Sequence, residues 1–188
     1  MSSPDRPLHR RALLLSGAFL LAGLAAGCGF RPVYAPGTAG GIGTATALAS
    51  VEIGPVATTA DVALRDEDER AAQQLTNELG FLFYRGGNPL PAAYALTTRM
   101  TLNELNLTLA SSGRATSTRI DAVANYSVTR IADGSVVLTA VSRGSATFDR
   151  SSQAFANLRA QRDAINRSMD LLANEMWTRL SAGLAVAP

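Results

Sequence analysis

The apolar positions near the start of the central region follow a two-residue period and then a helical one. Val51 and Ile53 alternate with Glu52, which predicts a short strand that ends at Pro55. Further on, apolar residues recur at steps of four, four and three and so predict one buried face of a helix, at Ala71, Leu75, Leu79 and Leu82. We expect this helix to end at Gly86-Gly87.

Four acidic residues, at positions 66–69, stand at the start of this helix. Asp66 with Glu69 three residues later resembles a capping box, and carboxylates in a first turn are stabilised by the positive end of the helix dipole. A metal site is the alternative use of such a cluster. We favour the helix cap.

Three longer segments with two-residue alternation follow. In the first, from Tyr94 to Leu102, the inward-facing side chains fall on even-numbered positions, and the phase then shifts to odd-numbered leucines. This shift predicts a bulge near Asn103-Glu104. The other two segments alternate over residues 120–128 and 138–148, and Asp133-Gly134 between them is typical of a tight hairpin.

From about Gln153 to Leu184 the period is helical again, so the element order is strand, helix, three strands and helix. Consecutive long strands form an antiparallel meander. The sequence therefore predicts an α+β fold in which two helices pack on one face of a four-stranded, mostly antiparallel sheet, in the order β-α-β-β-β-α. We expect residues 48–188 to form this single domain.

The first 27 residues show the three zones of a secretory signal peptide. Three arginines give a positive start, an apolar run covers residues 12–26, and small residues stand directly before Cys28. The run is shorter than the roughly 20 apolar residues that a membrane-spanning helix needs. We therefore expect residues 1–27 to be a signal peptide that is removed.

The residues before Cys28, Ala25-Ala26-Gly27, make a sequence that resembles a bacterial lipobox, although Ala25 stands where leucine is usual. The resemblance implies that the Cys28 sulfur receives a diacylglyceryl group and that Cys28 becomes the new N-terminus. Gly29 stands where an aspartate commonly retains lipoproteins in the inner membrane, so the outer membrane is the expected address. The alternative is a chance or buried cysteine behind an ordinary signal peptide. We interpret residues 28–47 as the lipidated N-terminus and a flexible tether rich in glycine, alanine and threonine.

Removal of the signal peptide limits the chemistry that is left. The whole sequence has 17 Lys and Arg, 15 Asp and Glu, and one histidine, His9, which lies in the signal peptide. The mature side chains carry 14 charges of each sign, so the basic balance of the precursor does not indicate nucleic-acid binding. Without histidine or a free thiol, the mature chain cannot form a Ser-His-Asp or Cys-His system or the usual zinc ligand set. We expect no catalytic residue, no metal site and no cofactor.

All basic residues of the mature chain are arginines, and three of them fall on one predicted surface. If the even-numbered strand residues face the helices, the odd-numbered ones face away, and this outer face carries Arg99, Arg119 and Arg143 among threonine and asparagine side chains. The plain interpretation is an ordinary solvated face. The sharper one is a surface for an anionic ligand, since guanidinium groups bind phosphates bidentately. Arg114, near the turn before the third strand, is a further candidate.

The segment AGCGFRPVY, residues 26–34, resembles the start of the mature chain in the LptE family of lipopolysaccharide-assembly lipoproteins. The chain length, the element order and the late helix rich in alanine and arginine are similar too. The resemblance implies a non-enzymatic protein that is held in the outer membrane by lipid, lodges as a plug in the lumen of the LptD β-barrel and binds lipopolysaccharide. Lipid A phosphates are anionic, so our candidate lipopolysaccharide contacts are Arg99, Arg119, Arg143 and Arg114, none of which a family motif covers.

Two other classes of protein stay open at this point. An auxiliary lipoprotein of an ABC-type lipid-trafficking system would share the lipobox, the size and the mixed fold, but would co-purify with an inner-membrane transporter. A periplasmic hydrolase with paired carboxylates would draw on Glu104, Asp121 and Asp149.

Overall fold

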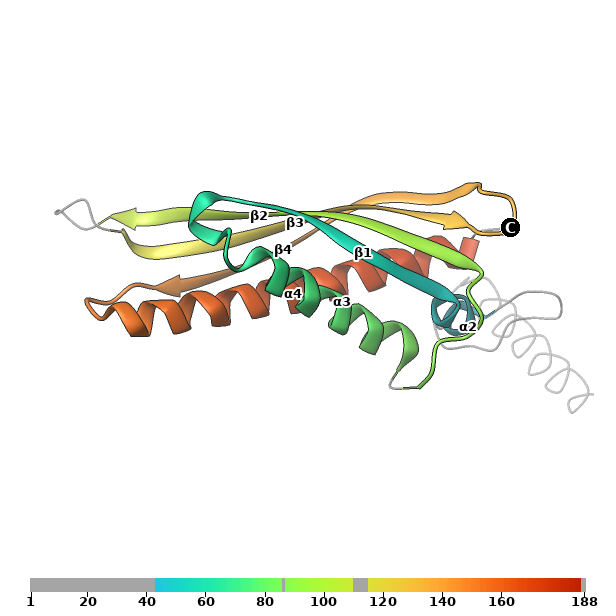
Figure 1. The fold of residues 1–188 in the computed structure, drawn as a ribbon, viewed down its shortest axis with the longest axis horizontal. Coiled ribbons are helices and arrows are strands. Elements are labelled where there is room, and N and C mark those ends of the chain that lie inside the picture. The colour runs from blue at the N-terminus through green and yellow to red at the C-terminus, as the bar shows by residue number, and fades with distance from the viewer. Residues whose placement is uncertain (1–42, 86, 110–114, 187–188) are drawn as a thin grey trace, which may run out of the picture. The chain divides into compact units, whose positions relative to one another are not determined.

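The structure, a computed structural model, describes residues 43–85, 87–109 and 115–186. Four strands in these ranges form one sheet in the order β1-β2-β3-β4 (Figure 1). They are β1 (Val51–Ala60), β2 (Tyr94–Leu109), β3 (Ala115–Arg130) and β4 (Val136–Asp149). The first pair is parallel and the other two are antiparallel. The predicted α+β class is confirmed, with a mixed sheet.

The connections explain these strand directions. A short turn of 3-10 helix, η1 (Val62–Leu64), and the helix α3 (Asp68–Tyr84) lie between β1 and β2, and such a crossover is what a parallel pair requires. β3 and β4 are joined by a hairpin in which Gly134 has a φ of 71°. Asp133 accepts hydrogen bonds there from the amide and the hydroxyl of Ser135. The predicted Asp133-Gly134 hairpin is confirmed.

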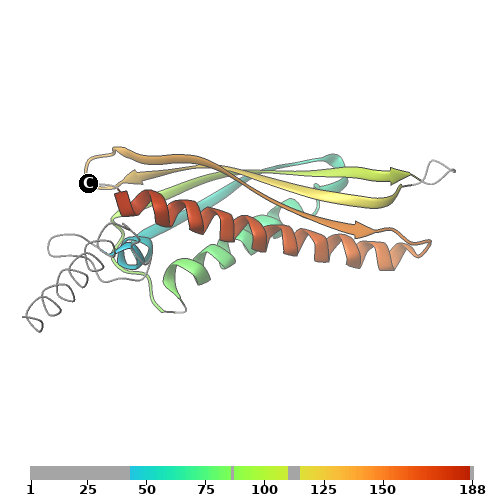
Figure 2. The same cartoon turned by 180° about the vertical axis from the view of Figure 1, so that it is seen from behind.

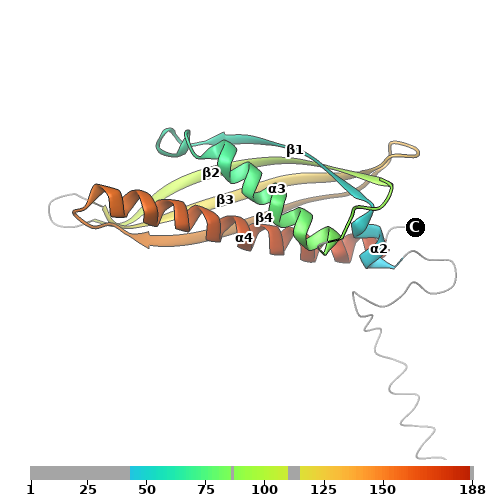
Figure 3. The ribbon, with the colours of Figure 1, turned by 60° about the horizontal axis from the view of Figure 1, so that its bottom comes forward.

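The helices lie on one face of the sheet, as Figures 2 and 3 show. The helix α4 (Ala154–Val186) runs along β4 and β3, while α3 packs against β1 and α4. A third helix, α2 (Thr44–Ala49), was not predicted and contacts both α3 and α4. It includes residues 44–47, which we had assigned to the tether, and it buries Ala47 and Leu48.

The face of the sheet that the helices cover holds the core. Even-numbered residues are buried along β2 from 96 to 102, along β3 from 118 to 128 and along β4 from 142 to 148. Opposite them, α4 contributes its own row of fully buried side chains, namely Ile165, Met169, Leu172, Met176 and Leu180. The predicted inward phase of the three long strands is thus confirmed over these positions.

The backbone of α4 passes very close to β4 at Gly144. A Cβ atom on this residue would lie 2.2 Å from the carbonyl oxygen of Ser168 and 2.7 Å from the amide nitrogen of Leu172. Both neighbours are backbone atoms, so no rotamer change can make room. Glycine is therefore what allows the helix to pack at this depth.

The predicted end of β1 at Pro55 is wrong, because the strand continues to Ala60. β1 lies at an edge of the sheet, and its register with β2 shifts between Ile53 and Val56. An edge strand with such an irregularity accommodates a residue that has no N–H to donate.

The predicted bulge near Asn103-Glu104 is also wrong. Both residues pair with β3 in regular register, and the shifts occur between Asn106 and Thr108 and between Thr108 and Leu109. The leucines that suggested the change of phase stay exposed, Leu105 by 47% and Leu107 by 45%. Polar contacts of Glu104, described below, fix the phase of β2.

The ends of α3 differ from the prediction as well. The helix begins at Asp68 and its N-cap is Glu67, so the predicted capping box of Asp66 and Glu69 is wrong, whereas the predicted acidic first turn is confirmed by Asp68 and Glu69. Glu67 instead binds two arginines, as described below. The last helical residue is Tyr84, and Arg85 takes the left-handed conformation with a φ of 51°.

Candidate functional site

The outer face of the sheet is the surface that the helices leave uncovered. Its residues are the odd-numbered positions of β2, β3 and β4, and hydroxyl and amide side chains are the largest group among them, beside charged and apolar ones. Across the three strands, one row joins Thr97, Ser127 and Thr139, and the next joins Arg99, Asn125 and Val141. This is a polar surface with few charges, built on a rigid sheet.

Arg99 and Arg143 lie near the middle of this face, on either side of β3. Arg99 pairs with Asn125 and Arg143 with Val123, so the two arginines stand in neighbouring rows. Strand spacing and rise put their Cα atoms about 12 Å apart, which long side chains can bridge around one anionic group. Both residues are exposed, and no ion pair in the described part of the chain involves either one. They therefore leave two uncompensated positive charges on the face.

Arg119, the third predicted arginine, is in a different situation. It stands in the row of Leu105 and Thr147, four residues along β3 from the row of Arg143. Its guanidinium binds Asp121 on the same strand, with 2.8 Å between Nε and Oδ1. The structure thus brings two of the predicted arginines close together and pairs the third with an acid. The fourth, Arg114, lies outside the described residues, as does Cys28.

A shallow hollow of about 260 Å³ crosses β2, β3 and β4 on this face. Arg99 is the one charged residue on its wall, and the other lining residues are Thr97, Asn125, Tyr126, Ser127, Thr139, Ala140 and Val141. The hollow can accept a group with hydrogen-bonding oxygens next to a positive charge.

The three carboxylates considered for hydrolysis do not converge. The side chain of Glu104 points to the helix side and is only 8% exposed, whereas Asp121 and Asp149 belong to the odd-numbered outer face. Glu104 forms an ion pair with Arg150 and accepts a hydrogen bond of 2.8 Å from Nε2 of Gln161 on α4. Its even position in β2 is the sequence signal for this internal role.

Glu67 has a similar internal role between α3 and α4. Its carboxylate binds Nε of Arg70 at 2.5 Å and Nε of Arg162 at 2.7 Å, and Arg70 also donates to Oδ1 of Asn166 at 2.7 Å. Burial is the strongest single influence and opposes ionisation, but the hydrogen bonds and charges of the two arginines together hold the pKa of Glu67 below its ordinary value. This part of the acidic run ties the two long helices together.

In the described ranges, no group of three or more His, Cys, Asp or Glu side chains could hold a metal ion. Among the helices of the same residues, none combines the length and the apolar character that crossing a bilayer requires.

The fold and the outer face together define a class, a single-sheet α+β protein with one face covered by helices and one polar face open. The family model for LptE, described as lipopolysaccharide-assembly, matches residues 48–180 and so includes every strand, α3 and most of α4. The chain belongs to this LptE family. Membership supports a role in lipopolysaccharide assembly.

Solved structures share the fold at low sequence identity, and no curated protein sequence matches the chain. A crystal structure of a Caulobacter crescentus CB15 protein assigned as a lipoprotein is 19% identical, has a TM-score of 0.57, and the match covers 77% of this chain and 97% of that one. Rare lipoprotein B from Shewanella oneidensis is 12% identical, with a TM-score of 0.48 and coverage of 70% and 95%. The similarity to the Caulobacter crescentus structure shows that the two proteins share a fold.

Proposed function

We propose that this protein is a lipid-anchored protein of the outer membrane that partners and plugs an LptD-like β-barrel and takes part in the transfer of lipopolysaccharide to the cell surface. The observation that carries the proposal is the match of the LptE family over residues 48–180. The anchor in this proposal is a lipid on Cys28, and the role is non-enzymatic.

The outer face supports a place inside a barrel lumen. Such interiors are hydrophilic, and a face of hydroxyl and amide groups can stay in contact with water and with the polar lumen wall. An apolar sheet face would be unsuitable there.

Arg99 and Arg143 are the residues that we propose for contacts with lipopolysaccharide. Their charges have no acidic partner in the described chain, so binding an anion requires no ion pair to break first. Charge-assisted hydrogen bonds from guanidinium groups suit the phosphates of lipid A. Arg119 belongs to the same proposal as a weaker contact, because Asp121 already binds it.

The proposal is tested by purifying the full-length tagged protein from detergent-solubilised total membranes. We expect a β-barrel protein to co-purify in a stoichiometric amount. Cys28→Ser should lose acyl labelling and globomycin-sensitive processing, because a hydroxyl cannot form the thioether. Recovery of an inner-membrane transporter in place of the barrel would contradict the proposal and favour an auxiliary lipoprotein of an ABC-type system.

A further inference from the structure

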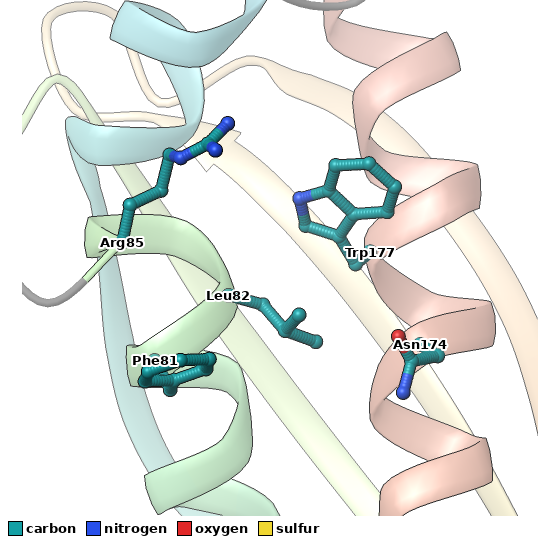
Figure 4. A pocket seen from close by; sticks show the side chains of 5 residues that line it. All are labelled: Phe81, Leu82, Arg85, Asn174 and Trp177. Carbon is teal, nitrogen blue, oxygen red and sulfur yellow. The ribbon is translucent and has the colours of Figure 1, made fainter.

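A groove of about 320 Å³ lies between α3 and α4, away from the outer face of the sheet (Figure 4). Phe81, Leu82 and Arg85 line it from the end of α3, and Asn174 and Trp177 line it from α4. Phe81 is 66% exposed although its side chain is large and apolar. Leu82 and Trp177 pack partly against the core. The groove thus offers two aromatic walls, a cation and an amide.

The chain enters the described domain close to this groove. The first described residue, Gly43, precedes α2, which packs against both α3 and α4 and lies beside the C-terminal end of α3 (Figure 3). The hydroxyl of Tyr84 donates to the carbonyl of Val51 at 3.0 Å and fastens the end of α3 to the start of β1. The amide of Leu90 likewise donates to the carbonyl of Ala49. These bonds hold the entry point of the chain next to the groove.

The ten residues directly before Gly43 contain one aromatic residue, and Phe30 lies further upstream. Residues 33–42 read VYAPGTAGGI, in which Tyr34 stands out from small residues that only a spacer would need. The eight residues between Tyr34 and Gly43 span up to about 30 Å when extended. That reach exceeds the length of α3, which is about 25 Å for its 17 residues. Tyr34 can therefore reach any part of the groove.

We propose that Tyr34, with Val33 beside it, binds in the groove between α3 and α4. The tyrosine ring enters between Phe81 and Trp177, where aromatic rings pack favourably in offset or edge-to-face geometry. Asn174 and Arg85 lie at opposite ends of the groove (Figure 4), so Asn174 can bond the hydroxyl at one end and the Arg85 guanidinium can approach the ring from the other. The docking does not rest on the lipid anchor. If Cys28 is lipidated, docking of Val33 and Tyr34 leaves a free spacer of four residues, 29–32, after the anchor.

The single tryptophan of the chain, Trp177, reports on this groove without any label. In the full mature chain in detergent, Tyr34→Ser should raise the acrylamide quenching constant of Trp177 about twofold and shift its emission to the red, since removing the ring uncovers the indole. The matched control is Ile42→Ser, which removes an apolar side chain from the same segment and should leave both values unchanged. Unchanged emission in Tyr34→Ser, or an equal change in Ile42→Ser, would overturn the proposal.

A second measurement does not depend on fluorescence. The pair Tyr34→Cys with Phe81→Cys should form an intramolecular disulfide under mild oxidation, while Tyr34→Cys with Val62→Cys should not, since Val62 is 80% exposed but precedes the other end of α3. If Trp177 stays protected from acrylamide quenching in Tyr34→Ser, and this protection falls when the protein is diluted, the groove is occupied by a second copy of the chain. If the protection from quenching does not change on dilution but changes when lipopolysaccharide is added, the groove is occupied by lipopolysaccharide. Either result overturns the docking of Tyr34.

Discussion

The two faces of the sheet are formed by the same strands, yet they contribute very differently to the free energy of unfolding. The inner face is a continuous apolar layer closed by α4, with twelve large side chains of the domain fully buried. The outer face is richer in hydroxyl and amide side chains, and its charges include Arg99 and Arg143, which form no ion pair in the described chain. The inner face thus maintains the fold. Substitutions on the outer face can therefore alter binding with little effect on the fold.

The strongest test of this difference is Gly144→Ala against Ser145→Ala, two neighbours on β4 that face opposite sides. The new Cβ at position 144 would lie 2.2 Å from the carbonyl oxygen of Ser168, so α4 must move away from the sheet. We expect a loss of about 3 kcal/mol in the free energy of unfolding, at the upper end of overpacking effects. Urea denaturation measures it.

Ser145→Ala is the matched control, since this residue is exposed on the outer face. Its free energy of unfolding should stay within about 0.5 kcal/mol of the unchanged protein. Equal losses in the two variants would show that the faces do not differ as described.

A smaller effect is expected from Glu67→Gln, which weakens the link between α3 and α4. The carboxylate binds Arg70 and Arg162, so the neutral amide should cost about 1–2 kcal/mol at pH 7. The folded protein holds the pKa of Glu67 below its ordinary value of 4.5. Its stabilising contribution is therefore complete above that value and is lost as the pH falls through the lower pKa of the folded state.

The measurement is urea unfolding of both proteins at pH 7 and at pH 3. The gap between Glu67→Gln and the unchanged chain should narrow at the lower pH, because below the ordinary pKa of 4.5 protons bind more readily to Glu67 in the unfolded chain, where no arginine lowers its pKa. Glu69→Gln is the control, since Glu69 is exposed in the first turn of α3 and should show little effect at either pH. A gap that stays constant between the two pH values would refute the role of the Glu67 charge.

The smallest effect on stability should come from Arg99→Glu combined with Arg143→Glu on the outer face. Unfolding should change by no more than about 0.5 kcal/mol, since both residues are exposed and have no ion pair in the described chain. Lipopolysaccharide binding should nevertheless weaken at least about tenfold, because each lost charge-assisted hydrogen bond contributes more than 1 kcal/mol. Equilibrium binding to purified lipopolysaccharide measures this.

Arg65→Glu with Arg159→Glu makes the same change in net charge on the side of the helices and serves as the control. Binding should be nearly unchanged in this control variant. Arg119→Ser should have an intermediate effect, since Asp121 already neutralises Arg119. Undiminished binding after both outer-face reversals would return Arg99 and Arg143 to an ordinary solvated surface.

The sequence predicted the parts of the fold that depend on periodicity. Alternation correctly assigned the inward face of β2, β3 and β4, and the apolar stripe of α4 was found with nearly the right ends. It failed where a distant partner decides the outcome. Leu105 and Leu107 suggested a change of phase, but Glu104 is held inside by Arg150 and Gln161, more than 40 residues later in the chain.

The candidate site was predicted only in part for the same reason. Alternation put Arg99, Arg119 and Arg143 on one face, but only strand register reveals which of them are neighbours. The short helix α2 was missed because six residues give too little periodicity to stand out from a glycine- and threonine-rich stretch. Glu67 looked like part of a cap because its partner Arg162 is 95 residues away.

The position of α4 in the chain has a consequence for biogenesis. All four strands precede this helix, so the nascent polypeptide exposes the apolar face of the sheet before α4 has been synthesised. Until about residue 180 has emerged, the buried residues of β3, such as Ile120 and Val128, lack the α4 side chains that cover this part of the sheet. A chaperone that holds the unfolded chain is thus most needed in that interval. A chain truncated before α4 should aggregate and should not form a shorter folded domain.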